Sequence, residues 1–148
     1  ILELGSGCGA QSRWLVDAER LILTEPEPQL VQLLEQLAPR WSNDPAKIAV
    51  HALSLPGDGL ARFDAEHIDT VVSFNVLEHI EDDQAVLAEA ANLLRRSSAP
   101  GPKRLISFVP AHPFAYGAHD RYTGHFRRYD RARWRSLAAA VAPESRHR

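Results

Sequence analysis

Short apolar runs alternate along this chain with segments in which apolar residues recur every three or four positions. The runs have the length and composition of buried strands, and the longer segments have the spacing of helices. We expect strands at residues 1–4, 20–24, 48–53, 69–74 and 105–109. Strands that alternate with helices build parallel sheets, because each helix carries the chain back to the start of the next strand. The alternation therefore predicts an α/β fold with an open, mostly parallel sheet and helices on both faces.

Four segments have the signals of helices. A short helix is expected around residues 12–18, a second begins at Pro28, a third covers about 83–94, and Asp130 suits the N-cap of the last. The positions expected to face the core are Leu30, Leu33, Leu34, Leu37, Val86, Leu87, Ala90, Leu93, Leu94, Trp134, Leu137, Ala138 and Val141. Each helix would then cover the sheet with one apolar face.

Length and composition are those of one ordinary domain. The chain has 148 residues, 45% of them hydrophobic, which is enough for a single core. Its formal net charge of -2 gives no bias toward nucleic acid or an anionic membrane, and no apolar run approaches the roughly 20 residues of a membrane span. The lone Cys8 excludes an internal disulfide, so we expect a cytoplasmic protein. Because the chain lacks methionine and opens on a strand, we also expect a fragment, truncated at both ends.

A glycine-rich segment, Gly5-Ser6-Gly7-Cys8-Gly9, follows the first expected strand. Glycines allow the chain to turn sharply and let backbone amides approach a ligand with no Cβ in the way. A strand before and a helix after are the context in which such a loop binds a cofactor. The glycines alone fit a dinucleotide, another cofactor, or a tight turn with no ligand.

Two carboxylates favour one of these cofactors. Glu3 lies where the pyrophosphate of a dinucleotide would approach, and its charge would oppose the phosphates. S-adenosylmethionine has no phosphate, and its sulfonium and ammonium groups would be stabilised by the same charge. Glu25 ends the second strand at the spacing at which an acid accepts hydrogen bonds from ribose hydroxyls, which suits either cofactor. The pair therefore predicts S-adenosylmethionine in preference to NAD(P).

The segment from Glu3 to Gly9 resembles the first motif of the class I S-adenosylmethionine-dependent methyltransferases, here those of the bacterial small-molecule type. The resemblance extends from the first strand to the helix after the fifth. It implies a Rossmann-like fold, so that residues 1–148 would be a single, partial methyltransferase domain. It also implies that Glu25 holds the ribose of S-adenosylmethionine. The residues implied at the methionine end of the cofactor are Glu3, Gly5, Ser6, Gly7 and Gly9.

The stretch from Asp69 to Asp82 is similar to the same family's fourth-strand segment, whose loop closes over the cofactor and the acceptor. This similarity adds Asn75 to the implied cofactor site. Family members often place an acid after the third strand to hold adenine, whereas this chain has Ser54 there, so Ser54 or a backbone group would take that place. Asn75 is not followed by the two prolines and the aromatic residue typical of methyltransferases that act on nucleic acid bases. We therefore expect no nucleic acid partner.

The segment after the fifth strand, residues 109–129, is rich in histidine, tyrosine and arginine. Ligands bind outside the carboxyl ends of the strands in an open parallel sheet, so this segment should border the transferred methyl group. His119 and His125 are candidate general bases if the acceptor is a hydroxyl. His79 is a third candidate, with bracing of the following helix as its alternative role.

The same segment contains the candidate substrate-binding residues. Arg127 and Arg128 have the forked guanidinium that would clamp a phosphate or carboxylate on the acceptor, and Tyr116 and Tyr129 lie near them in the sequence. The partner expected is thus a small-molecule acceptor, which would be acidic if the two arginines bind it. No membrane insertion is expected. A surface loop with solvated arginines is the alternative.

The function predicted is transfer of a methyl group from S-adenosylmethionine to a small-molecule, lipid-linked or sugar-linked hydroxyl or another nucleophile. Such a transfer is a direct displacement, which mainly requires alignment of the reactants and exclusion of water. An NAD(P)-dependent oxidoreductase and an inactive cofactor-binding fragment are the alternatives. A metal-assisted variant would use Glu78 and His79, but two adjacent residues fall short of a ligand set, so no metal is predicted.

Overall fold

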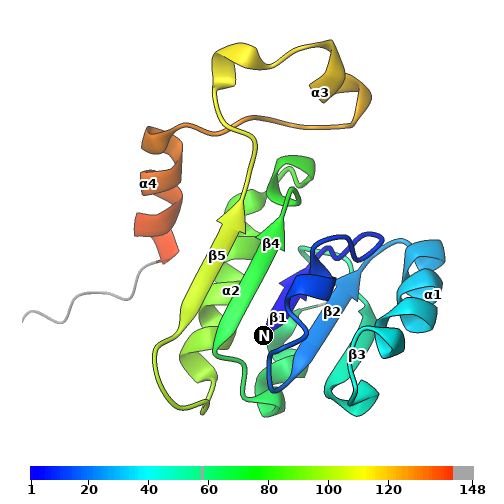
Figure 1. The fold of residues 1–148 in the computed structure, drawn as a ribbon. Helices are drawn as coiled ribbons and strands as arrows, with labels where there is room; N and C mark the ends of the chain where they lie inside the picture. The colour runs from blue at the N-terminus through cyan, green and yellow to red at the C-terminus, as the bar shows by residue number, and fades with distance from the viewer. Residues whose placement is uncertain (58, 142–148) are drawn as a thin grey trace, which may run out of the picture.

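The computed structural model describes residues 1–57 and 59–141, and its strands form one parallel sheet. The strands are β1 (Leu2–Leu4), β2 (Leu21–Glu25), β3 (Ile48–Ala52), β4 (Thr70–Phe74) and β5 (Arg104–Phe108). They lie in the order β3-β2-β1-β4-β5, with every neighbouring pair parallel (Figure 1). The order reverses between β1 and β4, and ligands of open α/β sheets bind at the carboxyl ends of the strands at such a switch point.

The helices are α1 (Pro28–Leu37), α2 (Asp83–Arg96), α3 (Ala118–Tyr122) and α4 (Arg131–Val141). Local chemistry sets where they begin. Pro28 starts α1. Proline is tolerated there because the first backbone N–H groups of a helix make no hydrogen bond within the helix. Asp82 caps α2 by accepting a hydrogen bond from the Ala85 amide at 2.9 Å, and Asp130 caps α4 through the Arg133 amide at 2.8 Å. No helix of the described residues is long and apolar enough to cross a membrane.

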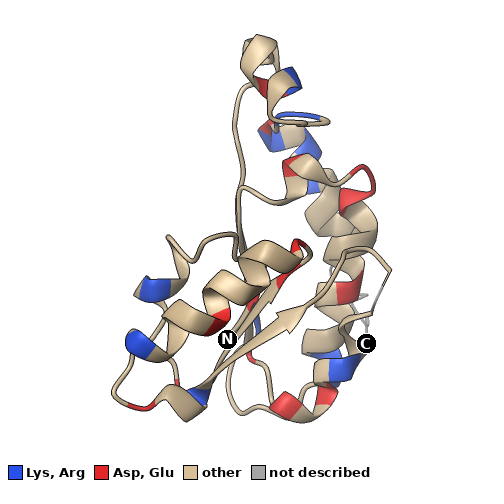
Figure 2. Ribbon diagram, turned by 90° about the vertical axis from the view of Figure 1, so that its right-hand side faces the viewer, with Lys and Arg blue, Asp and Glu red and all other residues tan. Residues whose placement is uncertain are grey.

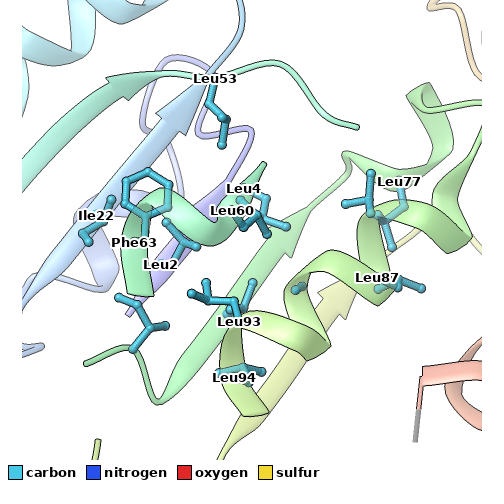
Figure 3. Packing of buried hydrophobic residues seen from close by; sticks show 14 of the residues in the cluster. Leu2, Leu4, Ile22, Leu53, Leu60, Phe63, Leu77, Leu87, Leu93 and Leu94 are labelled. Carbon is cyan, nitrogen blue, oxygen red and sulfur yellow. The ribbon is translucent and has the colours of Figure 1, made fainter. Parts of the chain in front are cut away.

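Two hydrophobic clusters cover opposite faces of the sheet. Along β2, Leu21 and Leu23 pack with Leu34 of α1, whereas Ile22 between them belongs to the cluster that contains α2. Successive side chains of a strand point to opposite faces, so a strand buried on both sides needs a continuous apolar run. Figure 3 shows the larger cluster, in which Leu2 and Leu4 lie with Leu93 and other residues of α2.

The sequence predicted this architecture, and the α/β fold with an open parallel sheet is confirmed. All five strands lie within one or two residues of the expected ranges. The helix expected around residues 12–18 is wrong, because the chain forms only a 3-10 turn at Ser12–Trp14 before β2 begins at Leu21. The glycine loop takes up the start of this connection, and its glycines with positive φ favour turns over a helix. Ala138, expected to face the core, is exposed, and the apolar contacts of α4 with the core are made by Trp134, Leu137 and Val141.

We call residues 109–130 the β5–α4 segment, which extends past the carboxyl ends of the strands and carries α3 (Figure 1). Backbone hydrogen bonds close its base: the His112 amide donates to the Tyr129 carbonyl at 3.0 Å, and the Tyr129 amide to the Pro110 carbonyl at 2.9 Å. Basic and acidic residues lie together at this end of the molecule (Figure 2). The segment is therefore an ordered excursion above the edge of the sheet where a ligand would bind.

Leu93 tests the packing of α2 on the sheet, because its side chain is 0% exposed. Leu93→Ala should lower the free energy of unfolding by about 2–5 kcal/mol, from lost burial and the cavity left behind. Gln84→Ala, an exposed position of the same helix, should change it by less than about 0.5 kcal/mol. Urea denaturation measures both values, and equal effects of the two substitutions would contradict this packing.

Candidate active site

A pocket of about 400 Å³ lies at the carboxyl ends of the strands, where the order of the sheet reverses. Its walls come from the segments that directly follow β1, β2, β3 and β4. The lining residues are Gly5, Gly7, Glu25, Pro26, Leu53, Ser54, Leu55, Asn75, Val76, His79 and Ile80. Four short connections that are distant in the sequence thus meet around one cavity, as the sheet order requires.

The glycine loop forms one wall, and two of its glycines have conformations that other residues rarely adopt. Gly5 has a φ of 65°, and a Cβ added there would lie 2.7 Å from Cγ2 of Val76. Gly7 has a φ of 56° and faces open space, with no atom within 4 Å of an added Cβ. Gly5 therefore permits close packing on the loop after β4, whereas Gly7 leaves its side of the pocket clear.

Gly9 has a packing role, because an added Cβ would overlap the ring of Trp41. Ser6 is buried beneath the loop, and its amide donates to the Thr24 carbonyl at 2.8 Å. Neither residue lines the pocket among the residues that the structure describes. Of the predicted loop residues, Gly5 and Gly7 therefore face the cavity, and Ser6 and Gly9 hold the loop in place.

Glu25, at the end of β2, fixes the loop and lines the pocket at the same time. Its Oε2 accepts a hydrogen bond from the Gly7 amide at 2.8 Å, and its Oε1 accepts one from the Glu27 amide at 3.2 Å. The residue is only 6% exposed. An ionised carboxylate has about four lone-pair positions, so two further hydroxyl donors could still be accepted from the pocket.

Glu3 lies within β1, on the face opposite Leu2 and Leu4, and is 2% exposed. Burial raises the pKa of Glu3, and the hydroxyls of Ser12 and Ser6 oppose that shift. Within the described residues its Oε2 has no hydrogen-bond partner. The structure thus places Glu3 beneath the glycine loop, apart from the residues that line the cavity.

Asn75 makes the turn after β4 in a left-handed conformation, with a φ of 54°. Asparagine tolerates this region better than most residues. The backbone amide of Asn75 donates to the Phe108 carbonyl at 2.9 Å, which connects the turn to the end of β5. The turn leads into a 3-10 turn at Leu77–His79. Asn75 and His79 therefore both line the pocket from this connection.

His79 and His125 are brought together, although they lie on different segments. Their rings meet edge to face with centroids 4.6 Å apart. Burial lowers the pKa of His79, and the neighbouring His125 lowers it further. His119, by contrast, is exposed on α3 and is not among the residues lining this pocket. Two of the three predicted base candidates thus form a pair at one end of the cavity.

His125 is oriented by Asp120, which is 0% exposed. The Nδ1 atom of His125 lies 2.9 Å from Oδ1 of Asp120, and Nε of Arg128 lies 2.7 Å from the same oxygen. The hydrogen bond from Arg128, with those from the Gly117 amide and His125, holds the pKa of Asp120 well below its usual range. The carboxylate is thus ionised and can only accept, so Nδ1 of His125 carries the proton.

Arg127 also has internal partners in this structure. Its guanidinium donates to the carbonyls of Ile80 and Glu81 at 2.6 and 2.7 Å and lies 3.3 Å from Asp83. Arg127 thereby anchors the β5–α4 segment to the wall of the pocket, whereas Arg128 and Asp120 form an ion pair within the segment. The predicted role of these two arginines as an anion clamp stays a prediction, since their observed contacts are to the protein.

The two tyrosines of the segment also make internal hydrogen bonds. The Tyr116 hydroxyl donates to the His125 carbonyl at 2.7 Å, and the Tyr129 hydroxyl donates to Oδ2 of Asp83 at 2.8 Å. Tyr129 is 3% exposed, and burial together with Asp83 raises its pKa. Substrate binding by these tyrosines likewise stays a prediction.

Several residues of this region were not singled out in the sequence. The apolar wall formed by Leu53 and Leu55 follows β3, and its position after a strand was the available signal. Asp120 gave no signal, because its role depends on how residues 117–128 fold around it. Glu78 was considered with His79 as a metal ligand, but its burial without a hydrogen-bond partner could not be read from the sequence. Glu78 is 0% exposed, burial raises its pKa, and neither of its oxygens has a partner among the described residues.

Comparison with known proteins agrees with this geometry. Residues 2–98 match the family model described as "Methyltransferase domain". The chain therefore belongs to the class I S-adenosylmethionine-dependent methyltransferase family. No curated protein matches it.

Solved structures with the same fold include a complex between the Haloferax volcanii Trm112 methyltransferase activator and a methyltransferase, at 19% identity and a TM-score of 0.67. The match covers 95% of this chain and 59% of that one, so the present chain spans little more than half of that relative. The methyltransferase domain of bacterial CtHen1-C matches at 19% identity, covering 95% and 72% of the two chains with a TM-score of 0.68. The N-terminal domain of EvdMO1, solved with S-adenosylhomocysteine bound, matches at 14% identity, 95% and 63% coverage and a TM-score of 0.67.

Asp83 tests how the β5–α4 segment is held against the pocket. It is 2% exposed and accepts hydrogen bonds from Tyr129 and Arg133 at 2.8 and 2.7 Å. Asp83→Ala should lower the free energy of unfolding by about 1–3 kcal/mol, because it leaves the buried hydroxyl of Tyr129 without its acceptor. Glu81→Ala, at an exposed position nearby, should stay within about 0.5 kcal/mol. Chemical denaturation distinguishes the two, and a silent Asp83→Ala would show that the network adds no stability.

Proposed function

We propose that this chain binds S-adenosylmethionine in the pocket at the ends of β1, β2, β3 and β4 and transfers its methyl group to a small-molecule acceptor. The observation that carries the proposal is the arrangement of Glu25 and the glycine loop at one side of the pocket and His79 at the other. The family assignment and the relative solved with S-adenosylhomocysteine support it.

The residues present fit this cofactor. The free lone pairs of Glu25 would accept the ribose hydroxyls, and Leu53 and Leu55 would contact the adenine face. Gly5 and Gly7 bring backbone to the methionine end without side chains in the way. The buried carboxylate of Glu3 beneath the loop would favour a cation above it and oppose a pyrophosphate. This charge is why we propose S-adenosylmethionine in preference to NAD(P).

When bound, the sulfonium cofactor would supply an electrophilic methyl carbon. The lone pair of the acceptor would form a bond to this carbon while the carbon–sulfur bond breaks, and the electron pair of that bond would stay on sulfur. The protein has to align the acceptor with this bond and to exclude water. We propose that the acceptor binds at the end bordered by Asn75, His79 and Ile80, where the β5–α4 segment is anchored by Arg127. We propose a hydroxyl or another small nucleophile as the acceptor. The base roles of His79, His119 and His125 stay predictions.

Glu25 gives the most direct mutational test of cofactor binding. Glu25→Ala should weaken the binding of S-adenosylhomocysteine, because a hydrogen bond to a charged group is worth about 1.5–3 kcal/mol. That loss corresponds to roughly a tenfold to hundredfold rise in Kd by isothermal titration calorimetry. Glu27→Ala removes an exposed carboxylate two residues away and should leave the Kd unchanged. Equal Kd values for the wild type and Glu25→Ala would sink the assignment.

Gly7 tests whether the open side of the glycine loop accommodates the cofactor. Gly7→Val should reduce affinity for S-adenosylhomocysteine by more than tenfold, since its side chain would occupy the space left clear beside the pocket. Gly101→Val is the matched control, because Gly101 also has a positive φ, 82°, and open space around an added Cβ, but does not line the pocket. Both variants should lose about 1–3 kcal/mol of stability through backbone strain. Normal affinity in Gly7→Val would place the cofactor elsewhere.

A further inference from the structure

Three side chains that can bind metal ions meet beside the pocket. Glu78 and His79 are consecutive in the 3-10 turn after β4, and His125 comes from the β5–α4 segment. One potential ligand atom from each of the three lies within 4.8 Å of those of the other two. The adjacent Glu78 and His79 alone fall short of a ligand set. The fold adds His125 as a third ligand, although it lies 46 residues after His79 in the sequence.

Glu78 is the feature of this cluster that most needs an explanation. Its side chain is 0% exposed, and within the described part of the chain neither carboxylate oxygen has a hydrogen-bond partner. The buried acids Asp83 and Asp120 both accept hydrogen bonds from arginines. Burying an unpaired carboxylate is costly, so such groups are usually neutralised by a proton, paired, or bound to a metal ion. The two histidines beside Glu78 make the last of these possible.

His125 is held in the orientation that a metal ligand requires. Its Nδ1 donates to Asp120, which leaves the lone pair of Nε2 available. A carboxylate that accepts a hydrogen bond from the other ring nitrogen is a common partner of metal-binding histidines, because it fixes the tautomer and the ring orientation. The backbone contributes as well: the Phe126 amide donates to the Glu78 carbonyl at 2.7 Å, and the Tyr116 hydroxyl donates to the His125 carbonyl. His125 is thus fixed from both sides against the turn that carries the other two ligands.

We propose that Glu78, His79 and His125 bind a divalent transition-metal ion, with Zn²⁺ as the reference ion. Two imidazoles and one carboxylate suit zinc and its first-row neighbours, whereas Mg²⁺ and Ca²⁺ prefer sites made of oxygen ligands only. Three protein ligands leave at least one coordination position open, as in catalytic metal sites. Because His79 lines the cavity, a metal ion held by it would lie next to the proposed acceptor end of the pocket.

Metal binding itself is independent of methyl transfer, whereas a role in the reaction rests on the proposed function. A metal ion lowers the pKa of an oxygen ligand and so helps a hydroxyl acceptor to lose its proton to solvent as the methyl group is transferred. The site would thereby narrow the acceptor class to molecules that offer an oxygen atom for coordination.

Calorimetric titration with Zn²⁺ in the absence of S-adenosylmethionine tests the site. We expect one zinc ion per chain, and at least a tenfold weaker affinity in Glu78→Gln and in His125→Ala. His119→Ala removes an exposed histidine of the same segment and should bind zinc like the parent. All chains should carry Cys8→Ser, because the exposed free thiol of Cys8 could bind zinc itself.

Thermal unfolding keeps the test decisive if a variant folds poorly. Zinc should raise the Tm of the parent chain and of His119→Ala, since a ligand that binds only the folded state stabilises it. At the same zinc concentration the rise in Tm should be smaller in Glu78→Gln and in His125→Ala, because their affinity for zinc is lower. No zinc binding by the parent, or equal binding by all variants, would overturn the site. Because S-adenosylhomocysteine binding is measured separately, failure of the metal site and failure of the cofactor site are distinguishable.

Discussion

The parallel pairing of β1 with β2 on one side and β4 on the other is the constraint on which the site depends. Leu2 pairs with Ile22 and Val71, so the three strands end together at one edge of the sheet. At this edge, Gly5 and Gly7 follow β1, Glu25 ends β2, and Asn75 and His79 follow β4. The pairing is stabilised by burial on both faces, because β1 and β2 lie between the cluster of α1 and the cluster of α2. The geometry of the pocket is thus a consequence of the core.

The buried acidic residues of this protein are of two kinds, those paired with arginines and those with unpaired carboxylate oxygens. Asp83 and Asp120 are buried against arginines of the β5–α4 segment and its following helix, and these contacts hold the segment in place. Glu3 and Glu78 are equally buried, but each has at least one carboxylate oxygen without a partner among the described residues. Glu3 lies beneath the glycine loop beside the hydroxyls of Ser6 and Ser12, whereas Glu78 lies beside His79 and His125. The metal ion proposed above would pair with Glu78.

Local patterns were enough to predict the sheet and to place the glycine loop and Glu25 at the carboxyl ends of its strands. Apolar runs and the spacing of Glu25 after the glycines follow from rules that act within about 25 residues, and the structure brings Glu25 and Gly7 into direct contact. The proximity of His125 to Glu78 and His79 depends on how a long segment folds back, which no periodicity encodes. For the same reason Arg127 and Arg128 looked like free anion ligands in the sequence, whereas the fold pairs them with Asp83 and Asp120.

The central claim is that S-adenosylmethionine occupies the pocket at the switch point of the sheet. Titration of the ¹⁵N-labelled chain with S-adenosylhomocysteine, followed by NMR, tests it at single residues. The account predicts shifts of the amide signals of Gly5, Gly7, Glu25 and Asn75, with the signal of Leu137 in α4 unchanged. NAD⁺ at the same concentration should leave all of them unchanged. Shifts confined to α4, or larger shifts of the glycine-loop signals with NAD⁺, would contradict the account.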